Sequence, residues 1–335
     1  MRDKLAIIGA SGLVGEEFIK ILKEENKFDQ FEILKFRRNR NEEEAEWSLS
    51  EDLDKLRECK FIFNAASSEA AKSVGALLRD GQYLIDNSSA YRMDPSVPLV
   101  VPEINAHLIS TTQKIFANPN CTAAILCMSL HPLQKFGIKQ LIVSTYQAAS
   151  GAGKEGLTEL RAQLKADKGA TLSTNVFGYR LGGNVISHNS AVRGSDKEAP
   201  GFNDEEFKVI EETRKIMNLP TLPVSITCVR VPVERAHTET VVLDLEQEVS
   251  VEELRKIYRD QAGVKLVDEA AKNYFPMPLE AEGKREVLVG RLRKDPTLSQ
   301  RILFMISGDQ LLKGAAWNAY QIFEVLLQKI SIAER

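Results

Sequence analysis

Cys121 is the residue of this sequence best placed to act as a nucleophile. It follows the polar turn Ala117-Asn118-Pro119-Asn120 and precedes an apolar run that predicts a helix. Asn120 can cap that helix, which places the thiol in its first turn. The helix dipole and the free backbone N–H groups favour an anion there, and the thiolate is the reactive form of cysteine. The alternative is a small, inert core residue.

Two further residues with catalytic chemistry lie close together in the sequence. Arg230 interrupts the β-prone segment 223–233 and points away from its neighbouring valines, so its charge needs an anion, a partner or solvent. His237 follows in a turn and can act as a general base, because its pKa lies near working pH. A surface histidine is the alternative, but the chain has only 4 histidines, so a catalytic one has few rivals.

Charged residues in two other places can bind anions or polar ligands. A predicted helix from Glu205 to Met217, capped by Asn203 or Asp204, carries Glu205 and Lys208 on one face. An exposed ion pair of little energetic value is the alternative for these two residues. Arg92 follows a strand end, and by itself it indicates only a solvated loop.

A glycine-rich turn near the start of the chain predicts a dinucleotide site. The apolar strand Leu5–Ile8 leads into Gly9-Ala10-Ser11-Gly12-Leu13-Val14-Gly15 and then a helix from Glu16 to Lys23. Glycines let the backbone approach a pyrophosphate, and the helix N-terminus supplies donors. The spacing is GxxGxxG, and a purely structural turn is the alternative. After the second strand, 31–36, the run Arg37-Arg38-Asn39-Arg40 favours a 2′-phosphate and hence NADP, with a solvated basic loop as the alternative.

The elements that must position these residues divide into two groups. Strands at 60–66 and 83–86 alternate with helices in the first part, which predicts a parallel sheet with right-handed crossovers. From residue 139 the strands look antiparallel and helices are fewer, which predicts a separate α+β domain. We expect one long amphipathic helix from Gln310 to Lys329. A chain of 335 residues is long for one core, so two domains are expected.

Composition excludes several classes of protein. With 44 basic and 47 acidic residues the net charge is −3, which argues against a nucleic-acid-binding protein. No apolar run is long enough to cross a bilayer, and the N-terminus carries no signal-peptide pattern. The cysteines at 59, 121, 127 and 228 have no metal-like spacing, so we expect no metal site, and free thiols in a reducing cytoplasm.

Several motifs in order make this sequence similar to the aspartate-β-semialdehyde dehydrogenase family over nearly its whole length. The motifs are 9–15, Tyr91-Arg92, 97–105, Asn118-Pro119-Asn120-Cys121, 144–153, 205–208, 228–233, Ala236-His237-Thr238-Glu239 and 308–316. The family pattern departs here at Arg37-Arg38-Asn39-Arg40, where a loop with Ser or Thr near a single arginine is common. Residues 178–203 match loosely, and we assign no roles there.

The resemblance implies a role for each candidate residue. Cys121 would form a thioester, His237 would be the acid/base that takes the hydroxyl proton, and Gln147 would position the substrate. The implied substrate ligands are Arg230 for the α-carboxylate, Glu205 for the amino group, Arg92 and Lys208 for phosphate, and Asn120. The implied NADP ligands are Gly9, Ser11, Gly12, Leu13, Val14, Arg38, Asn39, Ser150, Gly151 and Gln310.

The resemblance also implies the architecture and the reaction. A discontinuous NADP-binding domain of Rossmann type (1–120 with 311–335) would accompany a catalytic and dimerisation domain (121–310), in a homodimer or homotetramer. The reaction would be NADPH-dependent reduction of L-aspartyl-4-phosphate to the semialdehyde and inorganic phosphate, in biosynthesis of lysine, methionine, threonine and isoleucine. The alternatives are N-acetyl-γ-glutamyl-phosphate reductase and a catalytically silent relative that serves as a binding protein.

Overall fold

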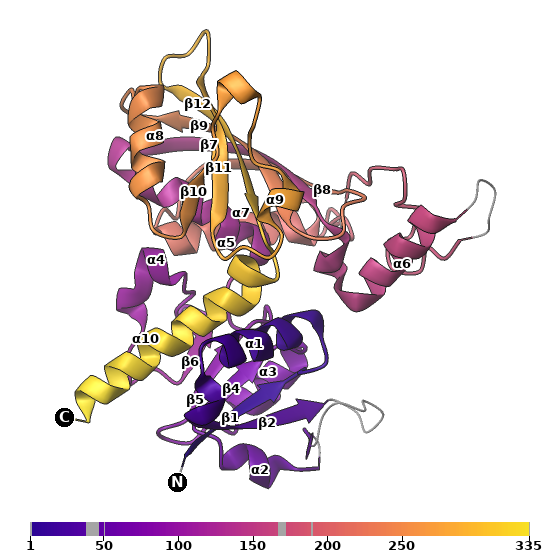
Figure 1. The fold of residues 1–335 in the computed structure, drawn as a ribbon, viewed down its shortest axis with the longest axis vertical. Helices are drawn as coiled ribbons and strands as arrows, with labels where there is room; N and C mark the ends of the chain where they lie inside the picture. Colours follow the sequence, from indigo (N-terminus) through magenta and orange to yellow (C-terminus); the bar gives the residue numbers. More distant parts are fainter. Residues whose placement is uncertain (1, 38–46, 50, 167–171, 189, 335) are drawn as a thin grey trace. The chain divides into compact units, whose positions relative to one another are not determined.

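The chain forms two compact units, each with its own sheet. The computed structural model describes residues 2–37, 47–49, 51–166, 172–188 and 190–334. The first unit comprises residues 1–120 and 314–335, and the second comprises residues 121–313 (Figure 1). Among the described residues, no helix has the length and apolar character needed to span a membrane.

The first unit is a parallel six-stranded sheet flanked by helices. Its strands are β1 (Asp3–Ile8), β2 (Phe31–Arg37), β3 (Trp47–Ser48), β4 (Phe61–Asn64), β5 (Tyr83–Asp86) and β6 (Ile115–Ala117). Its helices are α1 (Leu13–Glu24), α2 (Leu53–Arg57), α3 (Ser68–Gly75), α4 (Pro102–Asn105) and α10 (Trp317–Ala333), with short 3-10 turns at Lys27–Asp29 and Ala106–Leu108. The strand order is β3-β2-β1-β4-β5-β6, and every pairing is parallel, which confirms the predicted sheet.

Aromatic side chains pack on one face of this sheet and help to explain its buried strands. Phe18 of α1 stacks on Phe63 of β4 with ring centroids 3.9 Å apart. Phe323 of α10 packs edge-on against Phe31 at 5.3 Å and Phe61 at 5.1 Å. Burial of each such ring contributes about 1.5–3 kcal/mol. The last helix is therefore part of the first unit's core, although the whole second unit, residues 121–313, lies between it and β6 in the chain.

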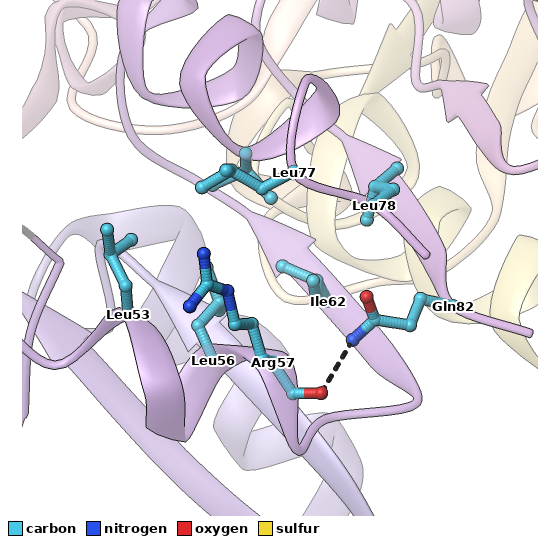
Figure 2. Close-up of a pocket in the computed structure, with 8 residues that line it drawn as sticks. Leu53, Leu56, Arg57, Ile62, Leu77, Leu78 and Gln82 are labelled. Atoms are coloured by element: carbon cyan, nitrogen blue, oxygen red, sulfur yellow. Dashed lines mark hydrogen bonds between the residues drawn. The ribbon is translucent and has the colours of Figure 1, made fainter. Parts of the chain in front are cut away.

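One small cavity lies between α2, β4 and α3 of the first unit. Its volume is about 10 Å³, and its walls are mostly leucine, isoleucine and valine side chains (Figure 2). Gln82 donates to the backbone carbonyls of Arg57 and Cys59 at 3.2 and 2.7 Å. A space of this size holds about one water molecule, so it is a packing gap and not a ligand site.

The second unit is a mixed six-stranded sheet with helices. Its strands are β7 (Ile138–Gln147), β8 (Val224–Arg230), β9 (His237–Leu245), β10 (Val264–Leu266), β11 (Val287–Lys294) and β12 (Arg301–Gly308). Its helices are α5 (Cys121–Leu130), α6 (Gly153–Lys165), α7 (Asp204–Met217), α8 (Val251–Asp260) and α9 (Pro278–Ala281), with 3-10 turns at His131–Phe136, Ala149–Ala152 and Ala270–Lys272.

The strand order β10-β11-β12-β9-β7-β8 confirms an α+β unit but includes parallel pairs. Strands β7, β9, β12 and β11 pair antiparallel in turn, whereas β7 pairs with β8 in parallel and β10 with β11 in parallel. The prediction of antiparallel strands was therefore incomplete. Helices α6 and α7 lie between β7 and β8 in the chain, and such a crossover connection permits parallel pairing.

Local chemistry sets two boundaries that differ from the predicted ones. The apolar run after Cys121 predicts a helix that continues to about Phe136, but the observed helix ends at Leu130, because Pro132 cannot continue α-helical hydrogen bonding. The predicted long C-terminal helix is preceded by a π-helical turn, Leu312–Ala316, before α10 begins. Asn203 and Glu206 form a capping box at the start of α7, so the cap is Asn203 and not Asp204.

Side-chain alternation in the second sheet gathers polar residues on one face. Thr145 of β7 is opposite Cys228 of β8 and Glu239 of β9, and Gln147 is opposite Arg230. Helix α5 is apolar all round and is buried from Thr122 to Leu130, as a helix at the centre of a unit should be. The functional side chains at the ends of β7, β8 and β9 thus lie on the buried side of the sheet.

Candidate active site

Cys121 is the accessible thiol of the chain. It is the first residue of α5 and is partly exposed, whereas Cys59, Cys127 and Cys228 are buried. Burial raises the pKa of Cys59 to about 12, and it raises the pKa of Cys127 and Cys228 further. Those three thiols are therefore protonated and inert at neutral pH, and a thiolate is favoured at the N-terminus of α5.

Gln147 joins the starts of two helices at the end of β7. Its Nε2 donates to Thr122 Oγ1 at 2.5 Å and to Glu205 Oε1 at 3.3 Å. Thr122 follows Cys121 in the first turn of α5, and Glu205 lies in the first turn of α7. The buried amide therefore fixes the position of Glu205 relative to the nucleophile.

Arg230 is a buried cation at the end of β8. Its Nη1 donates to the backbone carbonyl of Ala148, and its main chain pairs with Ile186 through N–H···O bonds of 2.9 and 3.0 Å. In the described part of the chain its Nε has no hydrogen-bond partner. Burial lowers the pKa of Arg230, while Glu205 and Cys121 act in the opposite direction. A buried donor without an acceptor is costly, so this side chain suits an anionic ligand.

His237 is the first residue of β9, and only 1% of it is exposed. Its Nδ1 accepts a hydrogen bond from the backbone N–H of Ala148 at 3.0 Å. Burial, together with the positive charge of Arg230, holds the pKa of His237 well below its usual value. The ring is therefore neutral at physiological pH, and its single N–H proton is on Nε2.

The absence of a side chain at Gly151 leaves space between these two groups. A Cβ built on Gly151 would lie 3.1 Å from Arg230 Nη1 and 3.3 Å from His237 Nε2. Both nitrogens consequently face the same space beside the Gly151 backbone. A larger residue would fill part of that space.

Helix α7 carries Glu205 and Lys208, and Glu206 fixes the helix to the sheet. The Glu206 carboxylate accepts the backbone N–H of Asn203 at 2.9 Å and the backbone N–H of Cys228 at 2.9 Å. Cys228 is two residues before Arg230, so this single buried side chain sets the distance between the helix and the arginine strand. Lys208 is half-buried one turn after Asp204.

Ser150 and Gln310 brace the segment before His237. Gln310 Nε2 donates to Ser150 Oγ, and its Oε1 accepts the backbone N–H of Ala236 at 2.8 Å. Ser150 Oγ donates to the backbone carbonyl of Glu234. Both residues therefore contact the turn that leads into β9.

The glycine turn of the first unit fits a dinucleotide. Gly9 has φ of +78°, and a Cβ there would lie 2.9 Å from the backbone oxygen of Ala65. A Cβ at Gly15 would lie 2.2 Å from the Gly9 oxygen. Gly12 caps α1 without a side-chain bond, so the first-turn N–H groups of Leu13 and Val14 can face an anion. Ser11 lies in the same turn, whereas Arg38 and Asn39 lie outside the described residues.

Arg92 is fixed beside the turn that precedes Asn120. Its Nε donates to the backbone carbonyl of Asn118 at 2.9 Å, and its Nη2 donates to that of Asn87 at 2.8 Å. The Asn118 amide bonds to Asn87 Oδ1 at 2.7 Å, and Asn318 of α10 donates to Asn118 Oδ1 at 2.7 Å. Asn120 is buried in the same turn. Asn318 was not predicted, because nothing in the sequence associates it with residue 118.

Helix α6 holds a loop against Arg230 through two buried polar side chains. Glu159 accepts Ser173 Oγ at 3.1 Å and the backbone N–H groups of Val176 at 3.0 Å and Phe177 at 3.3 Å. Gln163, one turn later, accepts the N–H groups of Leu181 and Gly182 at 2.7 and 2.8 Å and donates to the carbonyl of Ser173 at 2.8 Å. We call Glu159, Gln163 and residues 173–182 the loop clamp.

The loop clamp reaches the candidate site through Phe177. The Phe177 ring centroid is 5.9 Å from the Arg230 guanidinium carbon, and Ile186, just after the clamp, pairs with the Arg230 backbone. Sequence reasoning assigned no role to most of this segment. The polar residues Glu159 and Gln163 could have indicated this contact, but polar residues one turn apart on a helix usually mark an exposed face.

Comparison with known proteins assigns both parts of the chain to domain families. Residues 4–112 match the model of the semialdehyde dehydrogenase NAD binding domain, and residues 130–313 match that of the semialdehyde dehydrogenase dimerisation domain. The chain thus has the two-domain organisation of a semialdehyde dehydrogenase that uses a nicotinamide cofactor.

Similarity to individual proteins shows which semialdehyde dehydrogenase family the chain belongs to. The chain is 39% identical to aspartate-semialdehyde dehydrogenase of Prochlorococcus marinus, over 97% of this chain and 96% of the relative. It is 38% identical to that of Aquifex aeolicus, over 98% and 99%. The crystal structure of aspartate semialdehyde dehydrogenase II from Vibrio cholerae, complexed with ASA, superposes with a TM-score of 0.90 at 32% identity, over 98% and 99% of the chains. The chain belongs to the aspartate-semialdehyde dehydrogenase family.

Proposed function

We propose that this enzyme reduces L-aspartyl-4-phosphate to L-aspartate-4-semialdehyde and inorganic phosphate through a thioester on Cys121. The observation that carries the proposal is the buried Arg230, whose Nε has no hydrogen-bond partner among the described residues and which lies in the same unit as the accessible thiol. This pairing suits a small substrate with an anionic end and an electrophilic acyl carbon.

Each candidate residue of the second unit has its own role in the proposed reaction. The Cys121 thiolate attacks the acyl carbon, and phosphate leaves from the tetrahedral adduct. Arg230 binds the α-carboxylate and Glu205 the α-ammonium group, while Lys208 binds phosphate. Gln147 positions the substrate, since it already holds Glu205 and the first turn of α5. A bound nicotinamide would supply hydride to the thioester.

The residues of the first unit support cofactor and phosphate binding. The Gly9–Val14 turn would hold the pyrophosphate through backbone N–H groups, and Arg92 and Asn120 would bind the substrate's polar groups. We propose NADP as the cofactor, because Arg38 and Asn39 suit a 2′-phosphate. In the second unit, Ser150, Gly151 and Gln310 are proposed to contact NADP. Ser150 and Gln310 also brace the turn before His237.

The Glu205 carboxylate argues against the acetylated alternative substrate. Gln147 leaves Glu205 with a negative charge that a free α-ammonium group would neutralise. The N-acetyl group of N-acetyl-γ-glutamyl phosphate carries no charge, so that substrate would form no ion pair with the Glu205 carboxylate. A silent binding protein would not need the accessible Cys121 thiol.

A substrate comparison tests the proposal. The purified enzyme is assayed for NADP⁺ reduction with aspartate semialdehyde or N-acetylglutamate semialdehyde, each with phosphate. We expect phosphate-dependent turnover of the first and at least about tenfold lower kcat/KM for the second, as expected for loss of one ion pair worth about 1.4 kcal/mol. Preference for the acetylated substrate would contradict the assignment, and no turnover of either would favour the silent relative.

We further propose a homodimer formed through the second sheet, in the reducing cytoplasm that its free thiols suit. The outward face of this sheet carries apolar side chains that are only partly buried, and Tyr146 is 39% exposed. The other partly buried apolar residues on this face are Ile142, Val242, Leu303 and Met305. An apolar face of this kind favours burial against a second copy. Sedimentation velocity should give a dimer for the wild type and a monomer for Leu303→Arg; a monomeric wild type would refute this assembly.

A further inference from the structure

We propose that Asn318, on the last helix, is a positioning residue for phosphate binding, because its amide fixes the turn that holds Arg92. This inference rests on the proposed function, in which Arg92 of the first unit takes part in phosphate binding. A guanidinium suits a phosphate group, and its orientation decides how well the two fit. Asn318 acts on the phosphate only through Asn118 and Arg92.

Asn318 is a polar exception on the buried face of α10. It lies in the first turn of the helix and is fully buried, whereas the other buried residues of α10 are alanine, isoleucine, leucine, phenylalanine and tyrosine. Asparagine is a poorer helix former than alanine, and a buried amide needs hydrogen-bond partners. Its Nδ2 donates to the backbone carbonyl of Val100 at 2.8 Å and to Asn118 Oδ1 at 2.7 Å. The amide therefore joins α10 to two separate backbone segments of the first unit.

Asn118 is held through its main chain and through both ends of its side chain. Its backbone N–H donates to the carbonyl of Asp86 at 2.8 Å, and its Oδ1 accepts the bond from Asn318. Its Nδ2 donates to Asn87 Oδ1 at 2.7 Å and to the backbone carbonyl of Ala315 at 3.2 Å. Asn118 is fully buried, so rotation of its side chain would leave several of these groups without water or a partner.

The same pair of asparagines holds the guanidinium of Arg92. Its Nε donates to the carbonyl of Asn118 at 2.9 Å, and its Nη2 donates to the carbonyl of Asn87 at 2.8 Å. Because a guanidinium is planar, two hydrogen bonds along one edge fix the orientation of the whole group. The side chains of Asn118 and Asn87 bond to each other, so the two carbonyls that hold Arg92 are themselves fixed.

A guanidinium that is already fixed binds an anion at a lower entropic cost than a mobile one. An arginine side chain has many rotamers, and a ligand that must order them loses part of its binding free energy. Loss of the Asn318 amide would release Asn118 Oδ1 and with it the carbonyl that holds Arg92. The phosphate would then have to order the arginine, so we expect weaker phosphate binding when Asn318 is replaced.

The first test separates the two substrates of the oxidative reaction. Initial rates of NADP⁺ reduction are measured with phosphate varied at saturating aspartate semialdehyde, and then the reverse. Asn318→Ala should raise KM for phosphate about tenfold and change KM for aspartate semialdehyde less than about twofold, because residues of the second unit bind the semialdehyde. An unchanged KM for phosphate, or equal rises in both KM values, would overturn the proposal. If the alanine variant does not fold, Asn318→Leu fills a similar volume without a donor and should give the same result.

A matched control lies on the same helix. Gln321 is partly buried in α10, and its Nε2 donates to Glu103 Oε1 of α4 at 2.7 Å. Gln321→Ala therefore removes a polar contact of α10 that does not involve Asn118. We expect KM for phosphate to stay at the wild-type value in this variant. A rise equal to that of Asn318→Ala would show that any loosening of α10 weakens phosphate binding, and it would refute a specific role for Asn318.

A double-mutant cycle tests whether Asn318 acts through Arg92. Arg92→Ala alone should raise KM for phosphate, and adding Asn318→Ala should raise it by less than about twofold more, because the guanidinium that Asn318 positions is already absent. A purely structural role predicts that the two effects multiply, which would contradict the proposal. An unchanged KM for phosphate in Arg92→Ala would contradict it as well.

A direct titration distinguishes failure of this inference from failure of the proposed function. Absence of phosphate-dependent turnover in the wild type would refute the proposed function. Calorimetric titration of the wild type and Asn318→Ala with inorganic phosphate alone would then decide the positioning role. Binding about tenfold weaker in the variant would support it. Equal affinity in the two proteins, or no binding to the wild type, would refute it.

Discussion

Replacing Glu159 with glutamine tests whether the loop clamp positions Arg230. The buried carboxylate accepts three hydrogen bonds, from Ser173, Val176 and Phe177, and only 6% of the residue is exposed. Glutamine keeps one oxygen and places an NH₂ group where the second oxygen accepted N–H or O–H donors. At least one buried donor therefore loses its acceptor.

The magnitude follows from that lost acceptor. An unsatisfied buried N–H costs about 1–3 kcal/mol. The clamp reaches the substrate site through Phe177, 5.9 Å from the Arg230 guanidinium, so we expect the strain to appear in substrate binding. Since about 1.4 kcal/mol corresponds to a tenfold change, KM for aspartate semialdehyde should rise about tenfold, with kcat within about twofold.

Steady-state kinetics of NADP⁺ reduction at saturating phosphate provide the assay. The matched control is Glu155→Gln, an exposed residue one turn earlier on α6, which should leave KM unchanged. A role in folding alone would lower the amount of active enzyme, and hence apparent kcat, without changing KM. An unchanged KM in folded Glu159→Gln would refute the positioning argument.

Three further predictions concern the thiol, the arginine and an ion pair of the second sheet. Cys121→Ser should reduce turnover to background with the fold intact by circular dichroism; near-normal activity would exclude the covalent step. Arg230→Lys should raise KM at least about tenfold, because a lysine cannot bond both Ala148 and a carboxylate with planar geometry, and an unchanged KM would place the carboxylate elsewhere. Hydrogen bonds from the Arg301 guanidinium lower the pKa of Asp244 in the folded protein. The pair therefore stabilises the fold at pH values above the pKa of an unfolded aspartate, about 4, and this stabilisation is lost as the pH falls through the lower pKa of the folded state. Asp244→Asn should therefore cost about 1 kcal/mol in urea unfolding at pH 7 and less in acid; an equal cost at both pH values would contradict this reading.

Local patterns in the sequence identified the elements with short-range causes. The strand, glycine turn and helix at residues 5–23 follow from apolar runs and from glycines that neighbouring backbone leaves no room to replace. The helix that starts at Cys121 and the cap of α7 likewise follow from residues a few positions apart. Such interactions depend on the backbone within one or two turns, so periodicity and cap chemistry predict them.

Tertiary structure alone decided which groups meet. His237 Nδ1 receives its hydrogen bond from Ala148, 89 residues away, and this contact, not the identity of the residue, sets the imidazole's tautomer. Glu159 could have been an exposed helix residue, but the return of residues 173–182 buries it and gives it three donors. The burial of a side chain and its hydrogen-bond partners depend on the whole fold. The same side chain can therefore be an acid, a base, a hydrogen-bond donor or a structural contact, according to the groups that surround it.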